Sequence, residues 1–155
     1  MATPRVGKKV PAFSAPSTGG PLSSKDLAGA PYVLYFYPKD DTPGCTLEGQ
    51  GFRDQRPAFK RLGVRVLGVS RDTLSSHEKF RSKYALPFDL LSDADERLCK
   101  QFDVIKEKNM YGKKVMGVER TTFVIGPDGK IKHVFHKVKP EGHSEEVLEY
   151  LKEAA

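Results

Sequence analysis

The stretch from Tyr32 to Glu48 constrains the fold more than any other part of the sequence. It begins with Tyr32 to Tyr37, a run of β-branched, aliphatic and aromatic residues that is typical of a buried strand. Pro38 ends this strand, because proline has no N–H to donate to a neighbouring strand. Pro43 then predicts the first turn of a helix, where N–H groups have no intrahelical partner. The sequence therefore places Cys45 at the start of a helix that follows a buried strand.

A cysteine at a helix start is well placed for chemistry. The free backbone N–H groups and the positive end of the helix dipole favour the thiolate, which is the nucleophilic form of cysteine. The alternative is a cysteine that only packs at a strand end, since free cysteines are often buried as small apolar residues. Thr42 lies three residues before Cys45 and favours the reactive role, because packing does not require a hydroxyl there.

The spacing Pro38-x-x-x-Thr42-x-x-Cys45 resembles the active-site motif of the peroxiredoxins. The residues inside and after the motif are similar to those of the bacterioferritin-comigratory or Q-type branch. The similarity covers nearly the whole chain and includes Val69–Asp72, Ser76-His77, Leu90–Asp93 and Glu119–Ile125. It implies a thioredoxin-like fold of the peroxiredoxin type, an α/β fold in which helices flank a central mixed β-sheet.

The resemblance also implies the activity and its residues. A thiol-dependent peroxidase would reduce hydrogen peroxide and organic hydroperoxides to water or alcohols, with Cys45 as the peroxidatic residue that becomes a sulfenic acid. Arg120 is expected to supply a guanidinium that stabilises the thiolate and the transition state, although spacing alone does not locate it. Thr42 is expected to donate to the sulfur or the peroxide, and Pro38 and Gly44 to bind the substrate. The alternative is a peroxide-sensing redox signalling protein, in which oxidised Cys45 acts through a partner.

The second cysteine bears on how the sulfenic acid is reduced. Many Q-type members carry a second cysteine five residues after the first, where this chain has Gln50, and others carry it in the region of Lys79 to Lys83. Cys99 remains as a candidate resolving cysteine, but its apolar neighbours equally suit a cysteine that packs inside the protein. We therefore expect a one-cysteine cycle, in which an external thiol reductant (thioredoxin, glutaredoxin or glutathione) attacks Cys45.

Composition limits the other functions. The 155 residues are 38% hydrophobic and 30% charged, as expected for a single peroxiredoxin domain over residues 1–155. Two cysteines without C-x-x-C pairs argue against a disulfide framework and suit a reducing cytoplasm. The net charge of +6 is spread along the chain among acidic residues, which does not predict nucleic-acid binding. We also expect no membrane span and no export signal, because no apolar segment is long enough.

No cofactor and no metal are expected. His133 and His136 are three residues apart on a predicted strand, so they would face opposite sides and form a poor chelate. A cysteine–histidine hydrolase is disfavoured because nothing in the sequence places a histidine near Cys45. The expected partners are a peroxide and an external thiol, without nucleic acid or membrane, and the chain is expected to be a monomer or at most a weak dimer.

The remainder of the chain alternates between strand and helix patterns, which predicts a layered α/β domain with a mixed sheet. Strands are predicted near Phe13 and Leu22, at Val64–Val69, Phe88–Leu91 and Arg120–Ile125, and at Ile131–Val138 after the turn Gly126–Gly129. Helices are predicted after Cys45 with a kink or restart near Asp54 caused by Pro57, from a Ser75-x-x-Glu78 capping box to Tyr84, over Asp95–Phe102, and from Ser144. The segment Lys106–Gly117 has no clear hydrophobic period and is expected to be an exposed loop.

Overall fold

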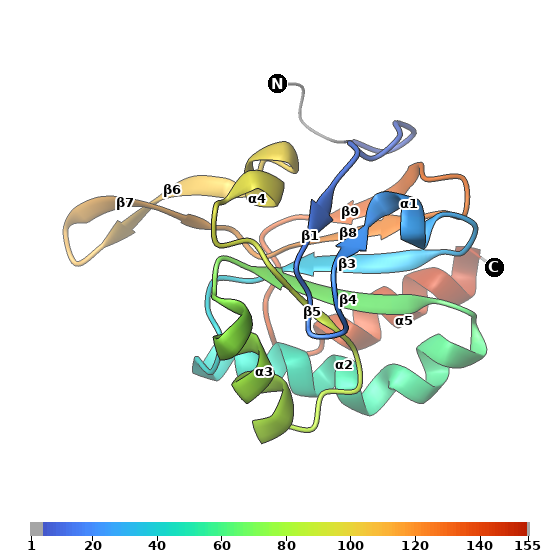
Figure 1. Cartoon of the computed structure of the whole chain (residues 1–155), viewed down its shortest axis with the longest axis horizontal. Helices are drawn as coiled ribbons and strands as arrows, with labels where there is room; N and C mark the ends of the chain where they lie inside the picture. The colour runs from blue at the N-terminus through green and yellow to red at the C-terminus, as the bar shows by residue number, and fades with distance from the viewer. Residues whose placement is uncertain (1–4, 155) are drawn as a thin grey trace.

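The computed structural model describes residues 5–154 as an α/β fold around a central sheet (Figure 1). The sheet has the order β5-β4-β3-β8-β9. Its strands are β3 (Tyr32–Phe36), β4 (Arg65–Ser70), β5 (Leu90–Ser92), β8 (Thr121–Ile125) and β9 (Ile131–Phe135). Because β3 pairs in parallel with β4 and antiparallel with β8, the sheet is mixed, as the resemblance implies. Residues 1–4 and 155 of the predicted single domain lie outside the described residues.

Helices cover both faces of this sheet. They are α1 (Ser24–Leu27), α2 (Pro43–Arg61), α3 (Leu74–Lys83), α4 (Arg97–Gln101) and α5 (His143–Ala154). Figure 1 shows α2, α3 and α5 below the sheet, with α1 and α4 above it. Within residues 5–154, none of these helices has the length and apolar character that crossing a membrane requires.

Strand β3 is buried on both faces, which explains its unbroken apolar sequence. Alternate residues of a strand point to opposite sides. Val33, Tyr35 and Tyr37 therefore pack in the cluster between the sheet and helices α2, α3 and α5. The other set, Tyr32, Leu34 and Phe36, packs in the cluster that includes α1 and α4. The two clusters share one sheet, which is consistent with the predicted single domain.

The N-terminal region agrees with its prediction of short strands. β1 (Ser14–Ala15) and β2 (Leu22–Ser23) form a small antiparallel pair.

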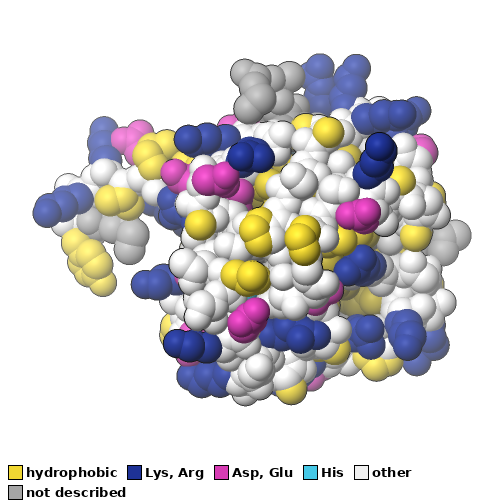
Figure 2. All heavy atoms as spheres, viewed as in Figure 1, with side chains coloured by type: hydrophobic (Ala, Val, Ile, Leu, Met, Phe, Trp, Pro, Cys, Tyr) yellow, Lys and Arg dark blue, Asp and Glu magenta, His cyan; other side chains and the backbone are white. Residues whose placement is uncertain are grey.

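Figure 2 shows lysine and arginine side chains spread over the visible face, with acidic side chains between them. This distribution matches the interleaved charges of the sequence.

The prediction of an exposed loop at Lys106–Gly117 is wrong, because this segment forms a β-hairpin. β6 (Ile105–Met110) pairs antiparallel with β7 (Lys113–Val118), and Figure 1 shows the hairpin projecting from the body of the protein. Most of the described β7 side chains are exposed, so the hairpin has no buried face to impose an alternating pattern. Its backbone pairing leaves no trace in the hydrophobic periodicity, and the prediction failed for that reason.

The expected restart at Pro57 is also wrong, since α2 continues through it to Arg61. Proline inside a helix costs about 3 kcal/mol, because one hydrogen bond is lost and the ring crowds the preceding turn. Phe52 and Phe59 lie on either side of Pro57 and are fully buried against the sheet. Each contributes about 1.5–3 kcal/mol by burial, which offsets the proline.

The N-cap of helix α3 lies two residues before Ser75, the predicted cap. Its N-cap is Thr73, whose hydroxyl accepts a hydrogen bond from the backbone N–H of Ser76 at 3.2 Å. Ser75 lies inside the first turn and is exposed. The motif was placed in the correct region, but threonine provides the cap.

We predict that Thr73→Ala lowers the free energy of unfolding by about 1 kcal/mol, because the N–H of Ser76 loses its acceptor. The matched control Ser75→Ala should change it by less than about 0.5 kcal/mol. Urea unfolding of the two variants measures both values. A larger loss in Ser75→Ala than in Thr73→Ala would contradict this cap assignment.

Candidate active site

Cys45 lies in the first turn of α2, as its sequence context predicts. Thr42 is the N-cap residue with an extended backbone, and Pro43 is the first residue of the helix. The Cys45 side chain is only 2% exposed and belongs to the cluster between α2 and the sheet. The sulfur is thus close to the positive end of a helix dipole and largely shielded from water.

The structure brings Arg120 next to Cys45, although 75 residues separate them in the sequence. Phe36, the last residue of β3, is paired with Thr121, the first residue of β8. Because these strands are antiparallel, the loop that leaves β3 toward Cys45 starts beside the residue that enters β8. Nη2 of Arg120 donates to Sγ of Cys45 at 3.1 Å. Sheet register therefore explains a contact that sequence spacing could not reveal.

Glu48 is a third member of this cluster that the sequence-based assignment did not include. Nη1 of Arg120 donates to Oε1 of Glu48 at 2.9 Å, so one guanidinium holds both the carboxylate and the sulfur. Glu48 is 1% exposed, and its Oε2 has no hydrogen-bond partner among the described residues. Its position three residues after Cys45 puts both side chains on one face of α2. That spacing was the available signal, but it does not indicate burial.

The charge balance around Arg120 depends on Glu48. Burial raises the pKa of Glu48 from its usual value of 4.5 to about 7, and the charge and hydrogen bond of Arg120 reverse only part of this rise. Glu48 therefore changes its charge near neutral pH. When it is protonated, Arg120 no longer has the negative charge of this partner.

Gly44 allows the guanidinium to approach the helix start. A Cβ atom at this position would lie 2.7 Å from Nη2 of Arg120 and 3.2 Å from Cγ of Pro140. Both distances are shorter than normal van der Waals contacts, so a larger residue would displace Arg120 or Pro140. Gly44 thus permits the contact between Arg120 and Cys45, in addition to its expected place in substrate binding.

Thr42 and Pro38 lie in the loop before α2. The hydroxyl of Thr42 donates to the backbone carbonyl of Lys39 at 2.9 Å. It does not donate to the sulfur, which was one of its two expected acceptors. Its oxygen still has lone pairs that can accept a hydrogen bond from a ligand. Pro38 is half-buried directly after β3, where it directs the chain out of the sheet.

Cys99 is far from this arrangement. It is fully buried in the cluster on the opposite face of the sheet from Cys45, and both cysteines are free thiols. Burial raises the pKa of its thiol far above the usual range, with a further increase from Asp93. The structure therefore does not bring Cys99, the candidate resolving cysteine, next to Cys45.

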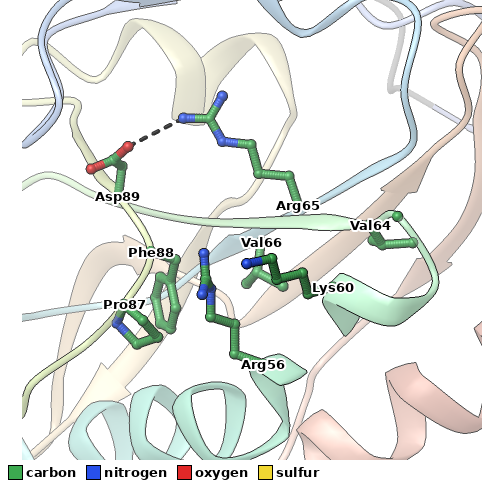
Figure 3. Close-up of a pocket in the computed structure, with 9 residues that line it drawn as sticks. Arg56, Lys60, Val64, Arg65, Val66, Pro87, Phe88 and Asp89 are labelled. Carbon is green, nitrogen blue, oxygen red and sulfur yellow. Dashed lines mark hydrogen bonds and ion pairs between the residues drawn. The ribbon is translucent and has the colours of Figure 1, made fainter. Parts of the chain in front are cut away.

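The cavities of the protein differ in their relation to Cys45. One of about 370 Å³ lies between the end of α2 and the start of β4, where Arg56, Lys60, Phe88 and Asp89 are among its lining residues (Figure 3). It is at the opposite end of α2 from Cys45. A hollow of about 280 Å³ lies nearer to Cys45, with Leu47, Gln50 and Pro140 among its lining residues. Neither Cys45 nor Arg120 lines either of these two cavities.

The chain is similar to known proteins over most of its length. The model of the AhpC/TSA family matches residues 6–134. The putative peroxiredoxin bcp of Coxiella burnetii is 51% identical over 144 residues, which cover 92% of this chain and 95% of that protein. Peroxiredoxin Bcp of Escherichia coli is 43% identical over 152 residues, which cover 97% of each chain.

Solved structures give the same result. Peroxiredoxin Q of Xanthomonas campestris superposes with a TM-score of 0.86 at 48% identity, covering 91% of this chain and 90% of that one. A PrxQ mutant of Xylella fastidiosa superposes with a TM-score of 0.93 at 42% identity and covers 99% of each chain. The thioredoxin-like fold of the peroxiredoxin type is therefore confirmed.

We predict that Glu48 makes the protein less stable as pH rises from about 4.5 to about 7. Over this range the unfolded chain loses the Glu48 proton while the folded protein keeps it, so the free energy of unfolding falls by about 3 kcal/mol. Glu48→Gln cannot ionise and should lack this decrease. Urea unfolding of both proteins across the range measures the difference.

The exposed glutamate Glu145 in α5 provides the control for this titration. Glu145→Gln should retain the pH dependence of the wild type. Parallel stability curves for the wild type and Glu48→Gln would contradict the assigned role of Glu48.

Proposed function

Because the chain belongs to the AhpC/TSA family, whose members reduce hydroperoxides with thiols, we propose that Cys45 is its peroxidatic cysteine. The protein is a peroxiredoxin of the Bcp type and a thiol-dependent peroxidase. These relatives do not favour the alternative of a peroxide-sensing signalling protein. The observation that carries the residue assignment is the 3.1 Å contact between Arg120 and the sulfur of Cys45.

In the proposed reaction the Cys45 thiolate attacks one oxygen of the hydroperoxide. An S–O bond forms, the O–O bond breaks, and the leaving oxygen takes a proton to give water or an alcohol. Arg120 stabilises the negative charge as it moves from the sulfur to the leaving oxygen. The N–H groups of Gly44 and Cys45 have no intrahelical acceptor and can hold the peroxide oxygens, while Thr42 can accept its O–H.

Reduction of the sulfenic acid is proposed to use one protein cysteine. An external thiol attacks the oxidised sulfur of Cys45 and forms a mixed disulfide with release of water, and a second thiol then releases the Cys45 thiolate. The proposed donors are thioredoxin, glutaredoxin and glutathione. The placement of Cys99 across the sheet supports this cycle, since a disulfide needs Cα atoms within about 7 Å.

The setting of this reaction is proposed from the composition. Two free, buried cysteines suit the reducing cytoplasm. The interleaved surface charges suit a monomer, or at most a weak dimer, that binds neither nucleic acid nor a membrane.

We predict that Arg120→Ala lowers the rate of Cys45 oxidation by hydrogen peroxide about 10²-fold, the scale for losing one transition-state donor. Gly44→Ala should lower it at least about tenfold, because the added methyl group displaces the guanidinium. Stopped-flow measurement of a single oxidation gives both rates, with Cys45→Ser as the inactive reference. Arg97→Ala removes an exposed arginine in α4 and should leave the rate unchanged. Wild-type rates in Arg120→Ala would remove Arg120 from the mechanism.

We predict that Cys99→Ser retains turnover with thioredoxin, glutaredoxin or glutathione, within about threefold of the wild type, because Cys99 takes no part in the cycle. Steady-state peroxide consumption measures this. Peptide mapping of peroxide-treated wild type should show no bond between Cys45 and Cys99. Loss of turnover with every donor, together with such a bond, would make Cys99 the resolving cysteine.

A further inference from the structure

A buried histidine and a buried aspartate meet beside the Cys45 loop, outside the residues assigned above. His77 of α3 is fully buried, and Asp40 in the loop after β3 is nearly so. Nδ1 of His77 lies 2.7 Å from Oδ2 of Asp40. Two ionisable groups at this depth are costly unless they neutralise each other and are fully hydrogen-bonded.

The hydrogen bonds identify the charge of each partner. Nε2 of His77 lies 2.8 Å from the backbone carbonyl of Leu91, which can only accept, so this nitrogen carries a proton. Asp40 also accepts from the hydroxyls of Tyr37 at 2.6 Å and Ser76 at 2.8 Å. Burial raises the pKa of the Tyr37 hydroxyl well above its usual value, with Tyr35 and Asp40 adding to the rise, so it remains a donor. With two hydroxyl donors on Asp40 and Nδ1 of His77 against Oδ2, the geometry matches a carboxylate beside an imidazolium.

This ion pair connects three elements around the active-site loop, residues 38–42. His77 and Ser76 belong to α3, and the carbonyl of Leu91 belongs to β5. The backbone N–H of Asp40 also donates to Oδ2 of Asp72, which follows β4. Asp40 is therefore bound through its backbone and both carboxylate oxygens.

The next residue of the loop is bound to the same helix. Asp41 accepts from Nζ of Lys83 at 2.7 Å and from the hydroxyl of Tyr84 at 2.5 Å. Asp41 has a backbone φ of 57°, which few residues other than glycine adopt. The loop thus holds an unfavourable conformation between two attachments to α3, directly before Thr42 caps α2.

Tyr35 belongs to the same apolar cluster as Cys45, and its ring stacks at 5.4 Å on Tyr37, which donates to Asp40. Its hydroxyl is buried and has no hydrogen-bond partner among the described residues. Burial raises its pKa well above the usual value, and the nearby charges of Glu48, Cys45 and Asp40 raise it further. The stacked rings of Tyr35 and Tyr37 thus connect the pair to the cluster that contains Cys45.

We propose that Asp40 and His77 are positioning residues for peroxide reduction, holding the loop that places Thr42 and the start of α2 around Cys45. This inference rests on the proposed function of Cys45. Neither residue contacts the sulfur, so both act through the loop. Stability alone does not account for the pair, because apolar residues of similar size stabilise a fold equally well or better.

The test uses the nearly isosteric variants Asp40→Asn and His77→Gln, which remove one charge each. Stopped-flow oxidation of Cys45 by hydrogen peroxide should be at least about tenfold slower in both, because a misplaced active-site group costs this much or more. Reduction of preformed sulfenic acid by an excess of small thiol should change by less than about threefold. This difference between the two half-reactions separates positioning from a general loss of structure.

Phe102→Leu provides the matched control, because it removes packing from the cluster on the other face of the sheet. It should lower stability without slowing oxidation. If it slows oxidation as much as Asp40→Asn does, or if Asp40→Asn oxidises at the wild-type rate, the proposal is overturned. If neither charge variant folds, Tyr37→Phe removes one donor to Asp40 and should still slow oxidation several-fold, and an unchanged rate then rejects the proposal.

Nitrogen chemical shifts of the His77 ring test the ion pair independently of activity. Both ring nitrogens should be protonated at neutral pH in the wild type, and one should lose its proton in Asp40→Asn. A neutral His77 in the wild type would overturn the proposal. If the wild type shows the ion pair but Cys45 does not react rapidly with peroxide, the proposed function fails while the ion pair itself stands.

Discussion

The antiparallel pairing of β3 with β8 is the constraint on which the active site depends. It sets the end of β3 beside the start of β8, through the pair Phe36 and Thr121. The chain leaving β3 turns into the helix that carries Cys45, and the chain entering β8 carries Arg120. A shift of one residue in this register would point the β8 side chains to the other face of the sheet. Burial of β3 on both faces opposes such a shift, so core packing and catalytic geometry have the same origin.

The active site also contains several buried charged groups. One guanidinium serves both Cys45 and Glu48, and neither partner is exposed. Asp40 and His77 form a second neutralised pair. Interactions between charges are stronger in such shielded surroundings than in water, so the arrangement of these charges decides whether the thiolate is stabilised. The loop before α2 lies between these two groups of charges, which ties its conformation to the chemistry of the sulfur.

Local sequence patterns predicted most of the fold and failed where local and tertiary effects differ. The strands around Gly126–Gly129 and the final helix agree with their predictions, because β8 is buried throughout its apolar run and α5 buries one regular face. The hairpin Ile105–Val118 was missed since its exposed side chains carry no period. At Pro57 the local rule predicted a break, but burial of two phenylalanines maintained the helix. At Pro57, packing with residues distant in sequence therefore outweighed the local preference.

For the site, the sequence by itself determined that Cys45 begins a helix after a buried strand, because prolines and apolar runs act locally. Arg120 was identified through family resemblance, since no local rule relates residues that meet only across a sheet. Only the tertiary structure decided that Glu48 is buried against Arg120 and that Cys99 lies on the opposite face from Cys45. The physical reason is that burial and charge pairing depend on which elements pack together, whereas helix starts and strand ends depend on neighbouring residues.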